Sequence, residues 1–148
     1  MLHLCYYCNM IKYSELKNIL KQHKLRVTDC RMDVLEYFIK NNQAFSFKNL
    51  EDEFTQYDRV TLYRTLHSFT ENGVFHKIPS DTGMITYGVC STTCSPQNHQ
   101  HNHMHFQCNC CGKVECLAED HIPVVKIPLY EVMEVNMILK GVCPQCIA

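Results

Sequence analysis

The sequence has no marked excess of charge of either sign and no long apolar run. Its formal net charge is -1, and each half of the chain is nearly balanced, which excludes attraction of nucleic acid by a global positive field. No segment approaches the ~20 apolar residues that span a bilayer, and no charged and apolar leader precedes a cleavage site. We therefore expect a soluble, cytoplasmic protein that does not bind membranes.

Cysteine and histidine, by contrast, are abundant: the 148 residues include 11 cysteines and 9 histidines. The cysteine count is odd, most cysteines lie from Cys90 onward, and two pairs have Cys-x-x-Cys spacing, Cys108/Cys111 and Cys143/Cys146. Disulfides are rare in a reducing cytosol, and a repeated Cys-x-x-Cys pair is typical of a metal site. The second half of the chain is therefore predicted to bind metal.

Apolar residues recur at helical spacing in four stretches of the first half. Each stretch has a side chain near its start that can cap a helix; in chain order these are Ser14, Thr28, Ser46 and Asp58. The fourth stretch is the clearest, because Leu62, Leu66 and Phe69 are spaced i, i+4 and i+7 and Asn72-Gly73 ends it. Its unusually polar outer face predicts a helix-turn-helix core.

The spacing of the apolar residues changes from helical to alternating after Gly73. Residues 74–78 and 85–89 alternate as strands around the turn sequence of residues 80–83, which predicts a hairpin directly after the fourth helix. Residues 10–89 are thus interpreted as a winged helix, and the polar residues 90–100 as a hinge. In residues 101–148 we expect short strands at 105–107, 113–115, 124–126 and 134–140. Pro123 and Pro128 disfavour a long helix between them.

The two Cys-x-x-Cys turns supply a full set of zinc ligands. Zinc prefers four tetrahedral ligands, and Cys108, Cys111, Cys143 and Cys146 would close the site, leaving no position for water. Gly112 relieves the tight backbone of the first turn. The alternative is two unrelated reduced pairs. Cys110, between two ligands, is expected to point elsewhere.

A histidine run precedes the first turn, at His99, His101, His103 and His105. If this stretch is extended, alternate residues share a face, so His103 and His105 can approach one ion. For His99 and His101 a flexible polar tract is the alternative.

Three further residues are candidate ligands: His76 on the predicted wing, Cys90 and Cys116. The alternatives are a buried thiol for each cysteine and an ordinary strand residue for the histidine.

The outer face of the fourth helix carries side chains suited to base recognition. Arg59, Tyr63 and His67 form one row, and Thr61, Arg64 and Ser68 lie beside it. Arginine can bind guanine bidentately, threonine and tyrosine can contact thymine methyl groups or phosphates, and a helix fits the major groove. A solvated helix face is the alternative.

These motifs, in this order and with these gaps, resemble the ferric uptake regulator family from about Met10 onward. The matching segments are Asp58–Leu66 with Gly73, His103–Gly112, Gly141–Cys146, and Leu25–Thr28 with Arg31. Residues 1–9, with Cys5-x-x-Cys8, have no counterpart and are expected to be a tail or a start-site artefact.

The resemblance implies an α+β fold: an N-terminal winged helix-turn-helix domain and a small C-terminal α/β zinc-binding dimerisation domain. It implies a homodimeric, metal-dependent transcriptional repressor that binds operator DNA, with Arg26 and Arg31 added to the DNA-contacting residues. A structural zinc and a second, regulatory ion follow from it. By position, the regulatory ligands are His76, Cys90, one or both of His103 and His105, and Cys116.

The sequence departs from the family at two ligand positions. Cys116 stands where several members carry an acidic ligand, and Ala44 or Phe47 stands at the place of a ligand histidine. The long helix of the dimerisation domain is expected to be truncated. Thiolates at Cys90 and Cys116 favour zinc over ferrous iron, so we expect a zinc sensor, with an iron- or peroxide-responsive regulator as the alternative.

Two interpretations from other classes are a zinc hydrolase or deaminase and a zinc-ribbon interaction module without DNA binding. The enzyme is disfavoured because no His-x-Glu supplies a general base and four thiolates leave no site for water. The ribbon is disfavoured by the fourth helix and the wing. We therefore expect no catalytic residue and no small-molecule substrate.

Overall fold

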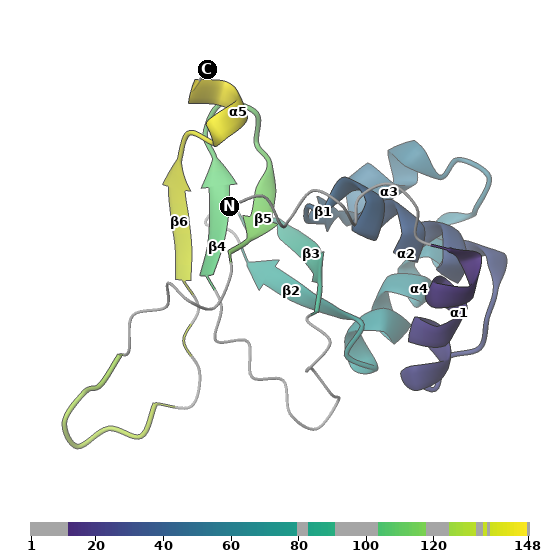
Figure 1. Cartoon of the computed structure of the whole chain (residues 1–148), viewed down its shortest axis with the longest axis horizontal. Coiled ribbons are helices and arrows are strands. Elements are labelled where there is room, and N and C mark those ends of the chain that lie inside the picture. The colour runs from purple at the N-terminus through teal and green to yellow at the C-terminus, as the bar shows by residue number, and fades with distance from the viewer. Residues whose placement is uncertain are drawn as a thin grey trace. The chain divides into compact units, whose positions relative to one another are not determined.

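A computed structural model describes residues 12–79, 83–90, 104–117, 125–132, 135 and 137–147. The chain divides into two compact units, residues 1–98 and residues 99–148, which are considered separately (Figure 1). The expected tail, most of the hinge, the hairpin tip at 80–82, Cys94, Val124 and the three histidines before His105 lie outside the described residues. Within the described parts of the chain, no helix is both long and apolar enough to cross a membrane.

The described residues of the first unit include four helices: α1 (Tyr13–Gln22), α2 (Asp29–Asn41), α3 (Phe47–Glu53) and α4 (Arg59–Glu71). Three of the predicted caps are confirmed. The side chains of Thr28, Ser46 and Asp58 each accept a hydrogen bond from the backbone N–H of the residue three positions later. Ser14 lies near the N-cap of α1, as expected, but the cap itself is Lys12, two residues earlier. The Glu15 carboxylate accepts the Lys12 backbone N–H at 3.2 Å, which satisfies that end of the helix.

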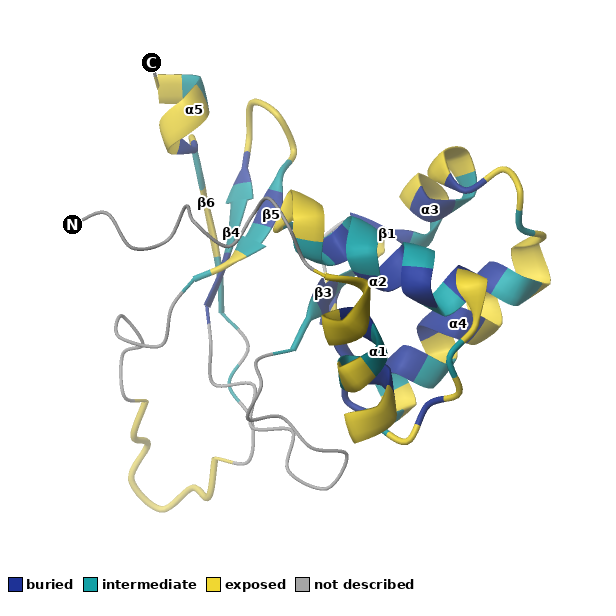
Figure 2. Ribbon diagram, turned by 45° about the vertical axis from the view of Figure 1, so that its right-hand side comes forward, coloured by how far each residue is buried: buried dark blue, intermediate teal, exposed yellow. Residues whose placement is uncertain are grey.

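Aromatic rings join the helices to the sheet in the core of this unit. Phe38 of α2 and Phe69 of α4 both contact Phe75 of the first wing strand, with ring centroids 4.3 and 4.7 Å apart. All three side chains are fully buried, and Figure 2 shows the buried faces of the helices turned inward. Burying a phenylalanine contributes about 1.5–3 kcal/mol, so these contacts fix α4 against the wing.

A three-stranded antiparallel sheet follows the helices, in the order β1-β3-β2. Its strands are β1 (Phe45–Ser46), β2 (Phe75–Pro79) and β3 (Ile85–Val89). The hairpin after α4 confirms the predicted wing, with β2 starting one residue later than expected. Strand β1 was not predicted, since two residues are too few to show alternation.

The second unit contains β4 (Met104–Cys108), β5 (Val114–Cys116), β6 (Met137–Gly141) and the short helix α5 (Pro144–Ile147). Strand β4 is central, antiparallel to β5 and parallel to β6. The strand predicted at 124–126 was wrong over residues 125 and 126, which are exposed and lead into a turn at Pro128; proline lacks the N–H that a strand pair needs. The described residues 125–132 also contain no helix.

Candidate metal centre and nucleic-acid interface

Parallel pairing of β4 and β6 brings the two Cys-x-x-Cys turns to one end of the second sheet. Cys108 ends β4 opposite Gly141, which ends β6, and the Asn109 backbone N–H donates to the Gly141 carbonyl at 2.7 Å. Gly112 has a φ of +73°, a conformation that only glycine adopts without strain. Proline at the first position of α5 suits a helix start, so Cys143 and Cys146 lie on one tight turn.

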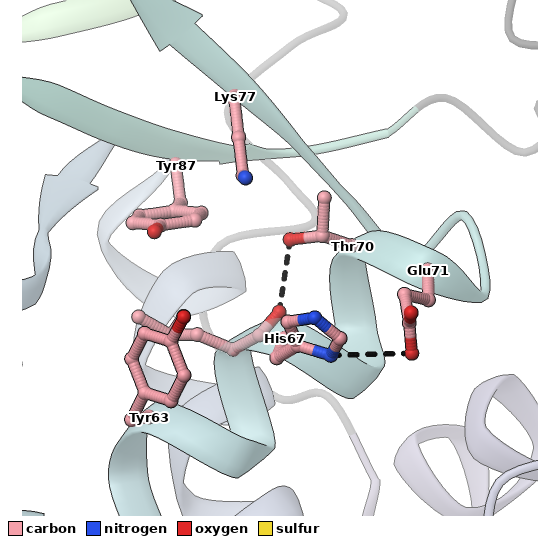
Figure 3. A pocket seen from close by; sticks show the side chains of 7 residues that line it. Tyr63, His67, Thr70, Glu71, Lys77 and Tyr87 are labelled. Atoms are coloured by element: carbon pink, nitrogen blue, oxygen red, sulfur yellow. Dashed lines mark hydrogen bonds and ion pairs between the residues drawn. The ribbon is translucent and has the colours of Figure 1, made fainter.

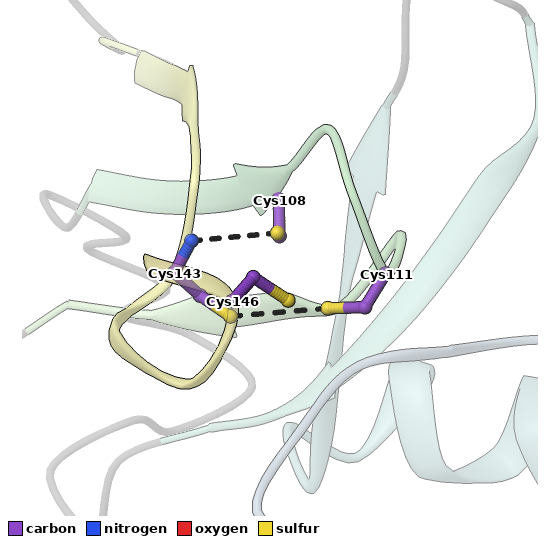
Figure 4. Close-up of side chains that lie close together, drawn as sticks. All are labelled: Cys108, Cys111, Cys143 and Cys146. Atoms are coloured by element: carbon purple, nitrogen blue, oxygen red, sulfur yellow. Dashed lines mark hydrogen bonds between the residues drawn. The ribbon is translucent and has the colours of Figure 1, made fainter. Parts of the chain in front are cut away.

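The four cysteine sulfurs all lie within 4.8 Å of one another (Figure 4). The Sγ atoms of Cys111 and Cys143 are 3.9 Å apart, close to the ~3.8 Å that two thiolates bound to one tetrahedral zinc would have and far from the ~2.05 Å of a disulfide. The donor set therefore fits a tetrahedral, thiolate-preferring ion. Cys110 is exposed and its sulfur is not among these four described ligand atoms.

The local backbone already stabilises negative charge at this centre. Backbone N–H groups of Cys111 and Cys143 lower the pKa of Cys108 to about 6. The backbone nitrogen of Cys143 lies 3.4 Å from the sulfur of Cys108. Hydrogen bonding with Cys143 and Cys111 raises the pKa of Cys146 to about 12. Without metal the sulfurs thus share protons, which a bound ion would displace.

A histidine–cysteine pair lies within the first unit. His76 on β2 is buried, and its Nδ1 is 3.6 Å from the sulfur of Cys90, the residue after β3. A tetrahedral zinc bound to one imidazole and one thiolate would separate those two atoms by about 3.6 Å. Gly88, directly opposite His76 in the sheet, leaves room for the ring.

A second such pair lies within the other unit. His105 on β4 and Cys116 on β5 are directly opposite in the antiparallel register, so their side chains share one face of the sheet. His105 is buried and Cys116 is exposed. The structure thus brings the predicted regulatory ligands together as two pairs, one in each unit, while His103 lies outside the described residues.

The predicted base-reading residues of α4 differ in their surroundings. Tyr63 and Arg64 are exposed. The Tyr63 ring packs edge-on against Phe47 of α3, with centroids 6.0 Å apart. Thr61 binds the capping Asp58, to which its hydroxyl donates at 2.6 Å; this hydrogen bond lowers the pKa of Asp58.

Two of the predicted arginines bind within the unit. Arg59 Nε is 3.5 Å from Glu51 of α3, and its guanidinium lies over the Phe47 ring, 5.4 Å from the centroid. Arg31 donates to the Arg26 carbonyl at 2.8 Å and to the Ser68 hydroxyl at 3.4 Å, while the Arg26 side chain is exposed.

Glu51 and Phe47 were not among the predicted site residues. Both lie on α3, the helix preceding α4. Their position one turn apart on that helix was the only feature of the sequence that could have indicated a shared role. Their contacts hold Arg59 and Tyr63, so they belong to the candidate interface.

A sequence model described as the ferric uptake regulator family matches residues 22–138. The chain belongs to the ferric uptake regulator family. It is therefore a metal-responsive transcription regulator and not an enzyme. The α+β fold with a winged helix and the family predicted from the motifs are both confirmed.

Similar proteins include a ferric uptake regulation protein of Staphylococcus epidermidis, 27% identical over 136 residues, which cover 86% of this chain and 91% of that protein. Among solved structures, the Helicobacter pylori ferric uptake regulator superposes with a TM-score of 0.61 at 16% identity, covering 93% of this chain and 95% of that one. A zinc uptake regulator complexed with zinc and DNA gives 0.59 at 22% identity, covering 91% and 92%. These likenesses support the fold.

Proposed function

We propose that this ferric uptake regulator family member is a zinc-responsive repressor, cytoplasmic and homodimeric, whose affinity for operator DNA rises when a regulatory zinc binds. The observation that carries the proposal is the His76–Cys90 pair, whose 3.6 Å N–S separation matches that of two ligands on one tetrahedral zinc. The Cys108, Cys111, Cys143 and Cys146 centre holds a separate, structural zinc.

Sulfur in both halves of the regulatory ligand set argues for zinc. Cys90 accompanies His76, and Cys116 accompanies His105. Thiolates favour zinc, whereas ferrous iron is better served by imidazole and carboxylate. The curated relative named a ferric uptake regulation protein supports an iron-responsive regulator as the second candidate, and the zinc uptake regulator structure supports the first.

DNA binding would use the exposed face of α4. Arg64 and Tyr63 are exposed on that helix, and the solved zinc uptake regulator is complexed with DNA. Arg59 has two possible roles. It would either leave Glu51 to contact a base, or keep its ion pair with Glu51, which would fix the direction of the Arg59 side chain. Arg31 and Thr61 would act indirectly, since their hydrogen bonds position the second helix and the α4 cap.

The metal would act by joining the two ligand pairs. An ion that takes ligands from the wing and from the second unit restricts how a DNA-binding unit can be oriented. Such an ion shifts the conformational equilibrium only through tighter binding to the competent arrangement, and DNA must then tighten the metal by the same factor.

The test begins with selection of duplexes from a random pool by the full-length protein in the presence of zinc. Binding of the selected duplex is then titrated with free zinc and, anaerobically, with ferrous iron. We expect zinc to activate at the lower free concentration. The variant Cys90→Ser/Cys116→Ser should lose this response while retaining one zinc per chain, and Cys110→Ser, with its exposed thiol, should behave as the parent.

Each other outcome points to a different conclusion. A zinc response unchanged in the double variant would show that Cys90 and Cys116 are not ligands. Activation by iron at the lower concentration would identify the iron-responsive regulator. Failure to enrich any duplex would favour a zinc-ribbon interaction module.

A further inference from the structure

A pocket of about 70 Å³ lies between α4 and the wing, entirely within the first unit (Figure 3). Helix α4 contributes Tyr63, His67 and Glu71 to its wall, and the wing contributes Lys77 and Tyr87. The last two are directly opposite each other in the β2–β3 register, so both side chains project from the same face of the hairpin. A cation and two hydroxyl groups from three elements therefore surround one small space.

The donors of this pocket have no partners among the residues that the structure describes. Neither the Lys77 ammonium nor the hydroxyls of Tyr63 and Tyr87 forms a hydrogen bond or ion pair there. Burial raises the pKa of Tyr87, and the neighbouring Tyr63 raises it further, so the Tyr87 hydroxyl stays protonated and can donate. The third hydroxyl of the lining already has a partner, because Thr70 donates to the Leu66 carbonyl at 2.9 Å.

We infer that this pocket seats one phosphate group of the DNA backbone, bound by Lys77 and by the hydroxyls of Tyr63 and Tyr87. The inference rests on the proposed DNA-binding function of α4. A helix in the major groove lies between two phosphate backbones, and phosphate contacts fix its register. Tyr63 and His67 are one turn apart on the exposed face of α4 and also border the pocket. The pocket therefore lies where the helix proposed to enter the groove meets the wing.

The acidic wall of the pocket selects a phosphodiester over a free phosphate ion. Glu71 is the carboxylate of the lining, and its oxygen is 3.2 Å from His67 Nδ1. A backbone phosphate carries a single negative charge, whereas inorganic phosphate near neutral pH carries more and is repelled more strongly. Glu71 should therefore weaken the site moderately and discriminate against small phosphate ions.

The first experiment measures how binding of the selected duplex and of an unrelated duplex by zinc-loaded protein depends on salt. Each phosphate neutralised on B-DNA contributes about -0.9 to the slope of log K against log salt concentration. Because each protomer of the proposed homodimer loses one contact, Lys77→Gln should reduce the slope by about twice that amount and weaken both duplexes by the same factor. Lys40→Gln is the matched control, because Lys40 is an exposed lysine of α2 near Glu36; it should keep the parental slope.

Two further variants probe the rest of the pocket. Tyr87→Phe should weaken both duplexes without changing the slope, because it removes a donor and no charge. Glu71→Gln should strengthen both, since it removes the repulsion. A duplex with one methylphosphonate at the contacted position should bind more weakly than the normal duplex to the parent, but equally to Lys77→Gln.

The outcomes separate this inference from the proposed function. A parent that prefers no duplex defeats both. A parent that prefers its selected duplex, with a Lys77→Gln slope equal to that of the parent, defeats the phosphate site alone. Lys77-dependent binding of inorganic phosphate to DNA-free protein, together with an unchanged DNA slope, would assign the pocket to small anions and also overturn the inference.

Discussion

Because Gly88 has no side chain, the ring of the candidate metal ligand His76 can pack directly against its backbone. A Cβ added there would lie 3.0 Å from Cε1 and 3.2 Å from Nε2 of the His76 ring, which is closer than carbon atoms pack without displacement. The opposite backbone thus holds the imidazole in place beside Cys90.

Gly88→Ala should therefore displace His76 and lower the regulatory zinc affinity by about 10- to 100-fold, the usual effect of disturbing a residue that orients a metal ligand. The structural zinc and the fold should remain. Competition titration with a zinc chelator measures both sites. Gly83→Ala serves as the control, because Gly83 also has a positive φ, of +77°, but a Cβ added there would meet nothing within 4 Å. Equal zinc affinities in parent and Gly88→Ala would contradict the role given to the glycine.

Tyr57 shows how one hydrogen bond makes stability depend on pH. Its hydroxyl donates to Asp33 at 2.7 Å, and this bond raises the pKa of Tyr57 from 10.0 to about 12. Because the folded-state pKa is the higher one, the stabilisation is complete below pH 10 and is lost as pH rises through 12.

Tyr57→Phe should therefore lower the free energy of unfolding by about 1 kcal/mol at pH 8, and the difference from the parent should shrink above pH 10. Urea unfolding at pH 8 and pH 11, followed by the helical signal, measures this. Tyr13→Phe, at an exposed tyrosine, should match the parent at both values. A Tyr57→Phe deficit that stayed constant with pH would show that the ring packing, and not the hydroxyl, carries the effect.

At the scale of elements, caps and periodicity made the first unit predictable. Helices α2, α3 and α4 begin after side chains that the sequence marks as caps, and α4 ends at Glu71, followed by Asn72 as its C-cap and Gly73 at a φ of +73°. The second unit was less predictable, since its short strands are held by pairing with distant residues and by the cysteine turns. The parallel β4–β6 pair has no local sequence signal, and α5 contains only four residues.

Because the cysteine turns hold β4, β6 and α5 together, removing one ligand should unfold the second unit selectively. Cys143→Ser should lose the structural zinc, and residues 99–148 should become sensitive to protease, because binding energy at a structural zinc site is folding energy. Helices α1 to α4 should persist. Metal analysis, circular dichroism and limited proteolysis check each statement, with Cys110→Ser as the control. A Cys143→Ser protein that kept one tight zinc and the parental proteolysis pattern would exclude this ligand set.

At the scale of the whole molecule, spacing grouped the four cysteines of the structural site, whereas the regulatory ligands were grouped only by the family resemblance. The spacing of Cys108 and Cys111 alone predicts a metal site. His76 and Cys90, by contrast, are 14 residues apart and lie side by side only because of the β2–β3 hairpin. His105 and Cys116 likewise meet through strand register. The role of Lys77 and Tyr87 was not foreseen for the same reason, since the pocket exists only once α4 packs on the wing.

An apolar surface in the second unit bears on assembly. Ile127, Leu129 and Tyr130 are 49% exposed, fully exposed and 74% exposed. Among the strands that the structure describes, β6 lies at an edge of its sheet, with Leu139 45% exposed. Edge strands and exposed apolar side chains are typical of interaction surfaces, and a second copy of the chain is the occupant that the proposed homodimer requires.

Leu129→Asp should consequently convert the dimer to monomer at micromolar concentration. Each protomer would lose ~1.5–3 kcal/mol of apolar burial, and two copies together would raise the dissociation constant at least about a hundredfold. Sedimentation equilibrium measures the constant directly. Tyr13→Ser, which removes an exposed aromatic side chain of α1, should leave it unchanged. Since one binding unit cannot occupy two half-sites, Leu129→Asp should also lose affinity for the selected duplex while retaining its structural zinc. If Leu129→Asp stayed dimeric at nanomolar concentration, the apolar segment would not be the interface, and the edge of β6 would be the next surface to alter.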